Sequence, residues 1–168
     1  MGESERLTLL SPAKINLFFR VLHKRDDGFH EIASLMQAIS FFDTISFVKS
    51  DINRLTCSHP NLSCDDSNIV YQGRELFQKR TALFTPFHIH IEKRIPMEAG
   101  LGGGSSNLAT TLWALNQLHQ FPVSSSELKR WAGELSSDAP FFFSTGTAYA
   151  TGRGERCEDQ SSLSPKKI

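Results

Sequence analysis

The sequence is organised around one glycine-rich stretch, Pro96-Met97-Glu98-Ala99-Gly100-Leu101-Gly102-Gly103-Gly104-Ser105-Ser106. Apolar and polar side chains alternate in residues 87–95, which indicates a strand, and leucines recur at helical spacing behind the stretch. Glycines let a backbone take positive φ and approach a ligand closely, and a helix start adds unpaired N–H groups and a positive dipole end. The order of strand, glycine loop and helix therefore predicts a phosphate-binding site. The alternative is a flexible glycine-rich connection, which usually lacks a strand before it and a helix immediately behind it.

Two common phosphate loops do not fit this stretch. A Walker loop needs Gly-Lys and then Ser or Thr after a four-residue gap, whereas Ser105 and Ser106 follow Gly104 directly. A dinucleotide fingerprint that starts at Gly100 needs Gly or Ala at its sixth position, which is Ser105 here. What remains is the pattern P-x-x-A-G-L-G-G-G-S-S at the start of a helix.

Length and composition fit one globular domain. The 168 residues can bury a real core, and 39% hydrophobic with 21% charged residues is ordinary for such a domain. Eighteen basic residues balance eighteen acidic ones, so no overall field draws the chain towards nucleic acid or an anionic membrane. No apolar run approaches the ~18 residues of a membrane helix, and residues 1–7 do not resemble a signal peptide. We therefore expect a cytoplasmic protein without a nucleic-acid or membrane partner.

Cysteines and histidines do not define a metal site. The three cysteines are Cys57, Cys64 and Cys157. Their odd number and the lack of a C-x-x-C pair favour reduced thiols over a disulfide framework, and a zinc corner that includes His59 lacks a fourth ligand. His88 and His90 lie on one face of the expected strand, where solvated sheet surface is the more common interpretation and a metal pair the alternative. No metal ligand is firmly assigned.

The order of expected elements indicates an α+β fold. Strands are predicted over residues 7–11, 14–22, 30–42, 43–48 and 55–58, which makes the first third largely antiparallel, and Pro12 is expected to interrupt the first strand. Asp66 or Ser67 is the expected cap of the next helix. Ser124 and Glu127 form a capping box for a later one.

The end of the chain changes in composition. Residues 141–150 are predicted to form the last strand. Residues 157–168 hold three serines and four charged residues, which predicts a polar tail or linker behind a domain of residues 1–156.

Three side chains outside the loop are candidates for chemistry. Lys14 enters an apolar strand, where edge or snorkelling lysines are the alternative. His30 alone is as compatible with a core or surface position as with a contact. Asp138 precedes an apolar segment, where it either caps a turn or needs a partner for its charge. Phosphoryl transfer is a reaction that uses such residues together. A lysine neutralises charge, a carboxylate accepts the hydroxyl proton, and the loop holds the phosphates.

Four segments resemble motifs of one kinase family. They are Pro12-Ala13-Lys14-Ile15-Asn16-Leu17, Arg25-Asp26-Asp27-Gly28-Phe29-His30, the glycine loop, and Ser137-Asp138-Ala139-Pro140-Phe141-Phe142. The loop is similar to that of the galactokinase–homoserine–mevalonate–phosphomevalonate (GHMP) kinase superfamily. The segment D-G-F-H narrows the resemblance to its kinases of 4-diphosphocytidyl-2-C-methyl-D-erythritol, in non-mevalonate isoprenoid synthesis.

The resemblance implies roles for individual residues. Lys14 and Asp138 would be the catalytic pair in phosphorylation of the substrate's 2-hydroxyl, with Asp138 as base. The loop Pro96 to Ser106 would bind the phosphates of ATP, used with Mg²⁺. Four residues would bind the cytidine diphosphate part of the substrate: Asn16, Phe29, His30 and Met36. Phe29 stands where the family often has tyrosine, and Met36 where an aromatic is common.

The resemblance also implies a fold and a departure from the family. The fold is the N-terminal GHMP kinase domain, similar to domain 2 of ribosomal protein S5, with a left-handed β-α-β crossover that is rare elsewhere. Family members continue into a ferredoxin-like C-terminal domain, which is absent from this sequence. We therefore expect the 168-residue chain alone to bind ATP weakly and turn over slowly or not at all. A normal turnover rate of the purified chain would contradict this.

Two other functions remain open. One is another small-molecule kinase of the superfamily, acting on mevalonate or homoserine. The other is a non-catalytic S5-like module that binds RNA or a protein. The second predicts a basic face, whereas the chain is neutral.

Overall fold

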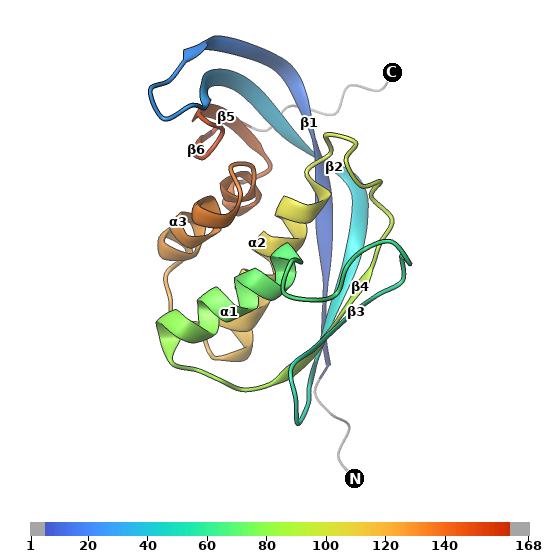
Figure 1. The fold of residues 1–168 in the computed structure, drawn as a ribbon. Helices are drawn as coiled ribbons and strands as arrows, with labels where there is room; N and C mark the ends of the chain where they lie inside the picture. Colours follow the sequence, from blue (N-terminus) through green and yellow to red (C-terminus); the bar gives the residue numbers. More distant parts are fainter. Residues whose placement is uncertain (1–5, 162–168) are drawn as a thin grey trace.

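A computed structural model describes residues 6–161 of the chain (Figure 1). The elements in order are β1 (Arg6–Lys24), β2 (His30–Lys49), β3 (Arg54–Cys57), α1 (Ile69–Thr81), β4 (Phe87–Glu92), α2 (Gly103–Leu118), α3 (Ser125–Leu135), the 3-10 helix η1 (Ala139–Phe143), β5 (Thr147–Gly152) and β6 (Arg156–Asp159). The predicted mixture of strands and helices is confirmed. The antiparallel β1–β2 pair dominates the first third, as expected.

The 20-residue strand β2 is the central strand of the sheet and pairs with three others. β1 pairs with it along one edge over nearly its whole length. The other edge is shared, because β5 pairs with residues 32–37 and β4 with residues 44–49. Within the described part of the chain, residues 38–43 lie between these two pairings. β3 adds to β4 in parallel and β6 to β5 in antiparallel, which gives the order β3-β4-β2-β5-β6.

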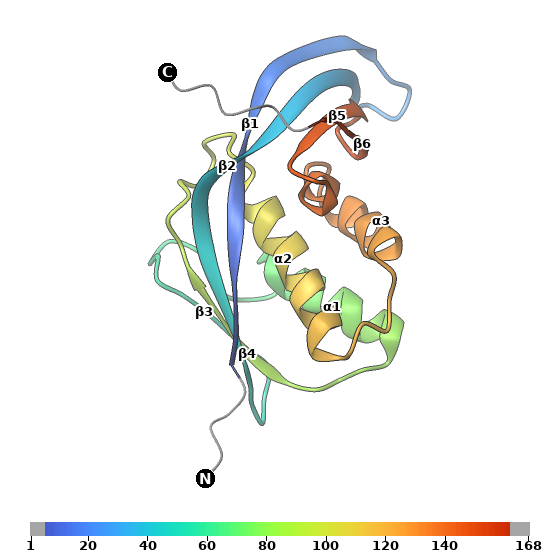
Figure 2. The same cartoon turned by 180° about the vertical axis from the view of Figure 1, so that it is seen from behind.

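The main core lies between the sheet and one layer of helices. Figures 1 and 2 show α1, α2 and α3 together on one side of the sheet, with the far end of the β1–β2 hairpin arching next to β5 and β6. Strand residues such as Phe47 and Ile89 pack against Phe77 of α1 and Leu112 of α2, all at most 1% exposed. A second cluster below β5 and β6 contains Met36 and Phe141. Burial of this apolar surface holds the helices, and with them the loop that starts α2, against the sheet.

Pro12 does not end the first strand. β1 runs through it, and the register shifts so that Pro12 faces Phe42 and Ala13 faces Ile39. Such a shift is a bulge, which absorbs a residue without a ladder donor and bends the strand. The expected interruption is therefore a bend inside one long strand, and it lies directly before Lys14.

Two local predictions are corrected near other element ends, and one capping hydrogen bond is found as predicted. The cap of α1 is Asn68, whose side chain accepts from Val70 N at 2.9 Å, and not Asp66 or Ser67. The 3-10 helix η1 includes residues 141–143, where the start of a strand was predicted, because Pro140 sets a helical φ at the first turn. The predicted capping hydrogen bond of Ser124 to Glu127 N is present at 3.3 Å.

The boundary predicted between residues 156 and 157 falls inside β6. Arg156–Asp159 pairs with β5, Cys157 is buried, and Lys129 of α3 donates to the Cys157 carbonyl at 2.8 Å. For residues 157–159 the prediction of a polar tail is wrong. Pairing with β5 provides hydrogen-bond partners for the backbone of this segment, although its side chains are mostly polar. The rest of the predicted tail, residues 162–168, lies outside the described part.

Replacing Asn68 by alanine tests the corrected cap. Asn68→Ala removes the bond to Val70 N and the bond from Asn68 Nδ2 to the Ser63 carbonyl. We expect the free energy of unfolding to fall by about 1–2 kcal/mol in urea denaturation. The matched control is Ser67→Ala, which loses only a hydroxyl bonded to Asp65 and is expected to change stability by less than about 0.5 kcal/mol. A larger loss in the control would return the cap to Ser67.

Candidate active site

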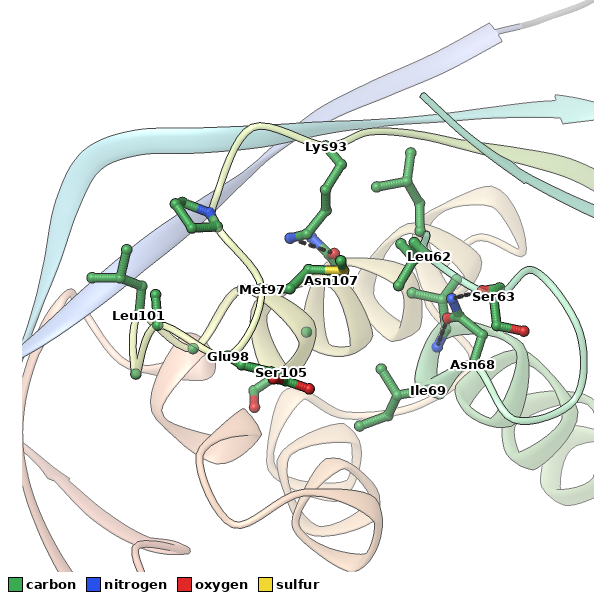
Figure 3. Close-up of a pocket in the computed structure, with 18 of the residues that line it drawn as sticks. Leu62, Ser63, Asn68, Ile69, Lys93, Met97, Glu98, Leu101, Ser105 and Asn107 are labelled. Carbon is green, nitrogen blue, oxygen red and sulfur yellow. Dashed lines mark hydrogen bonds between the residues drawn. The ribbon is translucent and has the colours of Figure 1, made fainter. Parts of the chain in front are cut away.

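The glycine loop connects β4 to α2 and forms one wall of a cavity of about 450 Å³ (Figure 3). The opposite wall comes from the β3–α1 connection and the start of α1, at Leu62, Ser63, Asn68 and Ile69. Lys93 and Asn107 lie at the base of the cavity, where Lys93 reaches from the end of β4 towards α2. The cavity therefore has apolar and polar side chains on one side and loop backbone on the other.

The loop leads into α2 in such a way that several backbone N–H groups lie before the first hydrogen bond inside the helix. Glu98, Gly100 and Gly102 all have φ between 58° and 74°, the left-handed region that favours glycine. Gly102 is the N-cap of α2 without any side-chain cap, and the first helical bond runs from Ser106 N to the Gly102 carbonyl at 2.8 Å. The N–H groups of residues 103–105 thus begin the helix ahead of its internal bonds, next to the cavity. This is the arrangement by which helix starts bind phosphate.

The two loop serines have different surroundings. Ser105 lines the cavity, and its hydroxyl is 2.8 Å from that of Ser136. Ser106 is fully buried and accepts a hydrogen bond from Ser11 at 2.8 Å. Ser105 is therefore available to a ligand in the cavity, whereas Ser106 ties the helix start to β1.

Lys14 and Asp138 form an ion pair beside the loop. Lys14 Nζ lies 3.2 Å from an Asp138 carboxylate oxygen and donates to Asn16 Oδ1, also at 3.2 Å. Lys14 N donates to the Leu101 carbonyl at 2.9 Å, which attaches β1 to the loop. The lysine side chain is 4% exposed and that of Asp138 34%. The predicted residues Lys14, Asn16 and Asp138 thus meet at the loop, although Asp138 lies far from the other two in the chain.

Close packing fixes the position of Lys14 against the loop. A Cβ atom built on Gly102 would lie 2.9 Å from Lys14 Cγ and 3.1 Å from Phe142 Cζ. Only glycine lets the lysine stem pass this close to the helix start. The position of the ammonium beside Asp138 therefore depends on Gly102.

Phe29 and His30 lie at the start of β2, in the turn of the β1–β2 hairpin. Both are exposed, and neither contacts Lys14 or Asp138 by a hydrogen bond or ion pair among the described residues. Asp27 fixes the turn by accepting from Phe29 N at 3.1 Å. Glu31 accepts from Arg25, the stronger effect, and from Gly152 N, and both bonds lower the pKa of its carboxyl.

The β5–β6 turn lies next to Phe29 on one side and next to Asp138 on the other. Arg153 lies 4.8 Å from the ring centroid of Phe29 in a cation–π contact. A Cβ atom on Gly154 would lie 3.4 Å from an Asp138 carboxylate oxygen. Sequence reasoning identified only a turn here, and the glycines on either side of Arg153 were its one available signal.

Met36 is not brought to this surface. It is 1% exposed and packs in the second core cluster with Phe141 and Ala148. A side chain without exposed surface offers no wall for a base to stack on, so we remove Met36 from the substrate contacts. Its alternation with neighbours in β2 turns it inward, a fact that depends on register.

Two features are missing from the described residues. Residues 6–161 contain no group of three or more His, Cys, Asp or Glu side chains arranged to hold a metal ion. None of the helices in this range is long and apolar enough to cross a membrane. His88 and His90 both lie 2.8 Å from the Thr56 hydroxyl, so their ring nitrogens are engaged on the sheet.

Known proteins resemble this chain over nearly all of its length. The family described as GHMP kinases N terminal domain matches residues 68–146. A Protochlamydia amoebophila (strain UWE25) protein named 4-diphosphocytidyl-2-C-methyl-D-erythritol kinase is 52% identical over 162 residues, which are 96% of this chain and 56% of that protein. A Solanum lycopersicum kinase of that name, described as chloroplastic/chromoplastic, is 48% identical over 166 residues, 97% of this chain and 41% of that protein.

Solved structures agree with these relatives. A crystal structure of 4-(cytidine 5'-diphospho)-2C-methyl-D-erythritol kinase has a TM-score of 0.77 at 35% identity, over 92% of this chain and 55% of that one. A crystal structure of mevalonate kinase has a TM-score of 0.72 at 16% identity, over 92% and 56%, and shows the shared fold. The chain spans about half the length of the curated relatives that it matches. Residues 68–146 thus match the N-terminal domain of GHMP kinases, and nearly the whole chain is similar to part of proteins named 4-diphosphocytidyl-2-C-methyl-D-erythritol kinase.

A pair of glycine variants tests the contact between the loop and Lys14. Gly100→Ala meets nothing within 4 Å, so it incurs only the cost of a left-handed φ, about 1–2 kcal/mol. Gly102→Ala incurs a similar φ cost and also displaces Lys14 and Phe142, which adds about 1–3 kcal/mol. We expect urea denaturation to show the larger loss for Gly102→Ala. Equal losses would mean that Lys14 moves away freely.

Proposed function

We propose that the site transfers the γ-phosphoryl group of ATP to the 2-hydroxyl of 4-diphosphocytidyl-2-C-methyl-D-erythritol. The observation that carries this proposal is the Lys14–Asp138 pair, held at 3.2 Å beside a phosphate-type loop. The names of the relatives support the same substrate. The chain supplies about half the length of those relatives, so the activity of a whole protein is part of the proposal.

ATP fits the cavity next to the loop. N–H groups at the start of the 16-residue helix α2 would bind its phosphates, assisted by the helix dipole. Leu62, Ile69 and Met97 give the same cavity apolar surface suited to a nucleoside. The loop residues from Pro96 to Gly104 line the cavity, in keeping with a continuous backbone cradle.

Magnesium would accompany the nucleotide. It prefers oxygen ligands and usually binds through substrate phosphates with one or two protein groups. Glu98 and Ser105 are loop residues with side-chain oxygens that line the cavity, and they would serve this purpose. When bound, the ion would neutralise charge on the transferring phosphate.

Asp138 and Lys14 would share the work at the attacking hydroxyl. Asp138 is the more exposed partner, so its carboxylate would accept the hydroxyl proton. Lys14 is held by Asp138 and Asn16 at 3.2 Å each, and its ammonium would stabilise negative charge that develops on the attacking oxygen. The hydrogen bond from Lys14 N to the Leu101 carbonyl would hold the lysine at a fixed position relative to the phosphates bound by the loop.

The cytidine end of the substrate would lie along the exposed hairpin turn. Phe29 offers an exposed ring for stacking, His30 donors and acceptors for a cytosine edge, and Asn16 a polar contact closer to Lys14. Arg153, beside Phe29, adds a positive charge where a diphosphate would pass.

The finer description of the fold follows from the same resemblance. We infer the arrangement of domain 2 of ribosomal protein S5, since the parallel pair β3 and β4 is joined through α1 as in a β-α-β unit. The remaining length of the relatives would supply the ferredoxin-like domain and the far wall of the substrate cleft.

Transfer of labelled phosphate from ATP to three alcohols tests the proposal. The assay uses this chain alone and a fusion to the remaining part of the Protochlamydia relative. We expect the fusion to phosphorylate the cytidine diphosphate substrate and to leave mevalonate and homoserine nearly unmodified. Preference for either of the other alcohols would assign the site to another branch of the superfamily. Loss of all three activities in a folded fusion would overturn the proposal.

Substitution of Asp138 separates the base from its surroundings. Asp138→Asn keeps the shape but cannot accept the proton, so we expect kcat of the fusion to fall by ~10²–10⁴-fold. The control Asp51→Asn changes an exposed carboxylate in the β2–β3 turn and should leave kcat within about twofold. A loss below threefold for Asp138→Asn would remove Asp138 from the base role.

A further inference from the structure

Asp43 is a fully buried carboxylate without a role in the chemistry described so far. It lies in β2 at the end of residues 38–43, between the pairings with β5 and β4. Burial of a charge is costly unless the charge is paired and hydrogen-bonded. The partners of Asp43 therefore indicate what this position requires.

All four partners belong to the segments that enter and leave the glycine loop. Asp43 Oδ1 accepts from Arg94 N at 2.7 Å and from Ile95 N at 2.8 Å, the two residues before Pro96. The second oxygen, Oδ2, accepts from Lys93 Nζ and from Asn107 Nδ2, the latter at 2.9 Å. One carboxylate thus fixes the backbone before the loop and the first turn of the helix behind it.

The same network reaches β1, which carries Lys14. Asn107 Nδ2 also donates to Ser11 Oγ at 2.9 Å, and Ser11 donates to Ser106 Oγ at 2.8 Å. Ser11 faces Asp43 directly across the β1–β2 pair. All these side chains are buried, so the bonds form away from competing water.

Lys93 adds a steric restraint at the helix start. A Cβ atom on Gly103 would lie 2.8 Å from Lys93 Nζ, so the ammonium packs against the first residue of α2. Its side chain is 4% exposed and its charge is balanced by Asp43. The position of this ammonium is therefore set by Asp43.

We propose that Asp43 is a positioning residue that holds the glycine loop and the start of α2 in the geometry needed to bind phosphate. The inference rests on the proposed function, because it assigns the network to the phosphate loop. Asp43 touches neither nucleotide nor substrate, and it acts through Arg94, Ile95 and Asn107. The separation of Ser11 and Lys14 by two residues lets the same network align β1 with the loop.

The argument requires a carboxylate and not merely a polar group. A carboxylate only accepts, and here donors face both of its oxygens. An asparagine at position 43 would direct its NH₂ either at two backbone N–H groups or at Lys93 and Asn107. In both orientations donors face donors, so the loop or the helix start must move.

Asp43→Asn in the full 168-residue chain is the test, and amide hydrogen exchange of Ser106 and Asn107, the first amides of α2 with helical hydrogen bonds, is the readout without nucleotide. We expect exchange at these two amides to rise about 10–100-fold, the range for loss of a hydrogen bond to a charged group. The matched control is Asn116→Asp, the reverse exchange near the other end of α2. Asn116 bonds Val123 N and the Val123 carbonyl, so this variant lowers stability away from the loop.

Measurement at a temperature where both variants are fully folded separates positioning from general destabilisation. Faster exchange at Ser106 and Asn107 in Asp43→Asn, with Asn116→Asp within about twofold of the unmodified chain there, supports the proposal. Equal exchange at these amides in the two variants overturns it. If Asp43→Asn does not fold, Ser11→Ala decides, because it removes two bonds of the network. Unchanged exchange at Ser106 and Asn107 in Ser11→Ala then overturns the proposal.

Titration with ATP is a separate measurement. Where the unmodified chain binds ATP, we expect Asp43→Asn to weaken the affinity at least about 10-fold and Asn116→Asp to change it less than about twofold. An unmodified chain that binds no ATP contradicts the proposed function of the chain alone. The exchange experiment then still decides whether Asp43 positions the loop.

Discussion

The long antiparallel pairing of β1 with β2 is the constraint on which the rest of this structure depends. It places Ser11 opposite Asp43 and carries Lys14 and Asn16 past the bulge at Pro12 towards the glycine loop. The shared second edge of β2 then holds β4, which leads into the loop, and β5, which leads to the turn beside Asp138. A one-residue slip would reverse which side chains face the helices and dismantle the site.

Features that are local in the sequence could be predicted. The glycine loop, the strand before it and the helix behind it lie within one stretch, so periodicity and glycine content identify them. The capping box at Ser124 is equally local, and one of its two hydrogen bonds is present, whereas the Glu127 carboxylate accepts from Arg130 and Trp131. The meeting of Lys14 with Asp138 is different, because the two residues lie far apart in the chain. Their types suggested shared chemistry, the family resemblance paired them, and only the folded sheet supplies their distance.

What could not be predicted depends on register and on the packing of distant segments. Asp43 sits in an apolar strand and gives no sign that its partners lie some fifty residues later. The family resemblance assigns Met36 to the substrate, whereas in the structure it points into a buried cluster. This inward orientation depends on the register of β2, which the sequence does not show. The strand β6 was missed because pairing with β5, and a bond from Lys129, order a segment of polar composition. In each case tertiary contacts outweigh the local pattern.

Two buried lysines beside the loop differ in the exposure of the carboxylate with which each is paired. Lys93 is paired with a carboxylate that has no exposed surface and whose oxygens already accept from two backbone N–H groups and an amide. Such a pair cannot exchange its partner for a ligand without uncovering a buried charge, which is strongly unfavourable. Lys14 is as buried, but its partner Asp138 is one-third exposed and can exchange the lysine for an incoming hydroxyl. The same ion-pair chemistry would therefore fix the loop at Asp43 and leave Asp138 accessible for the proposed role as base.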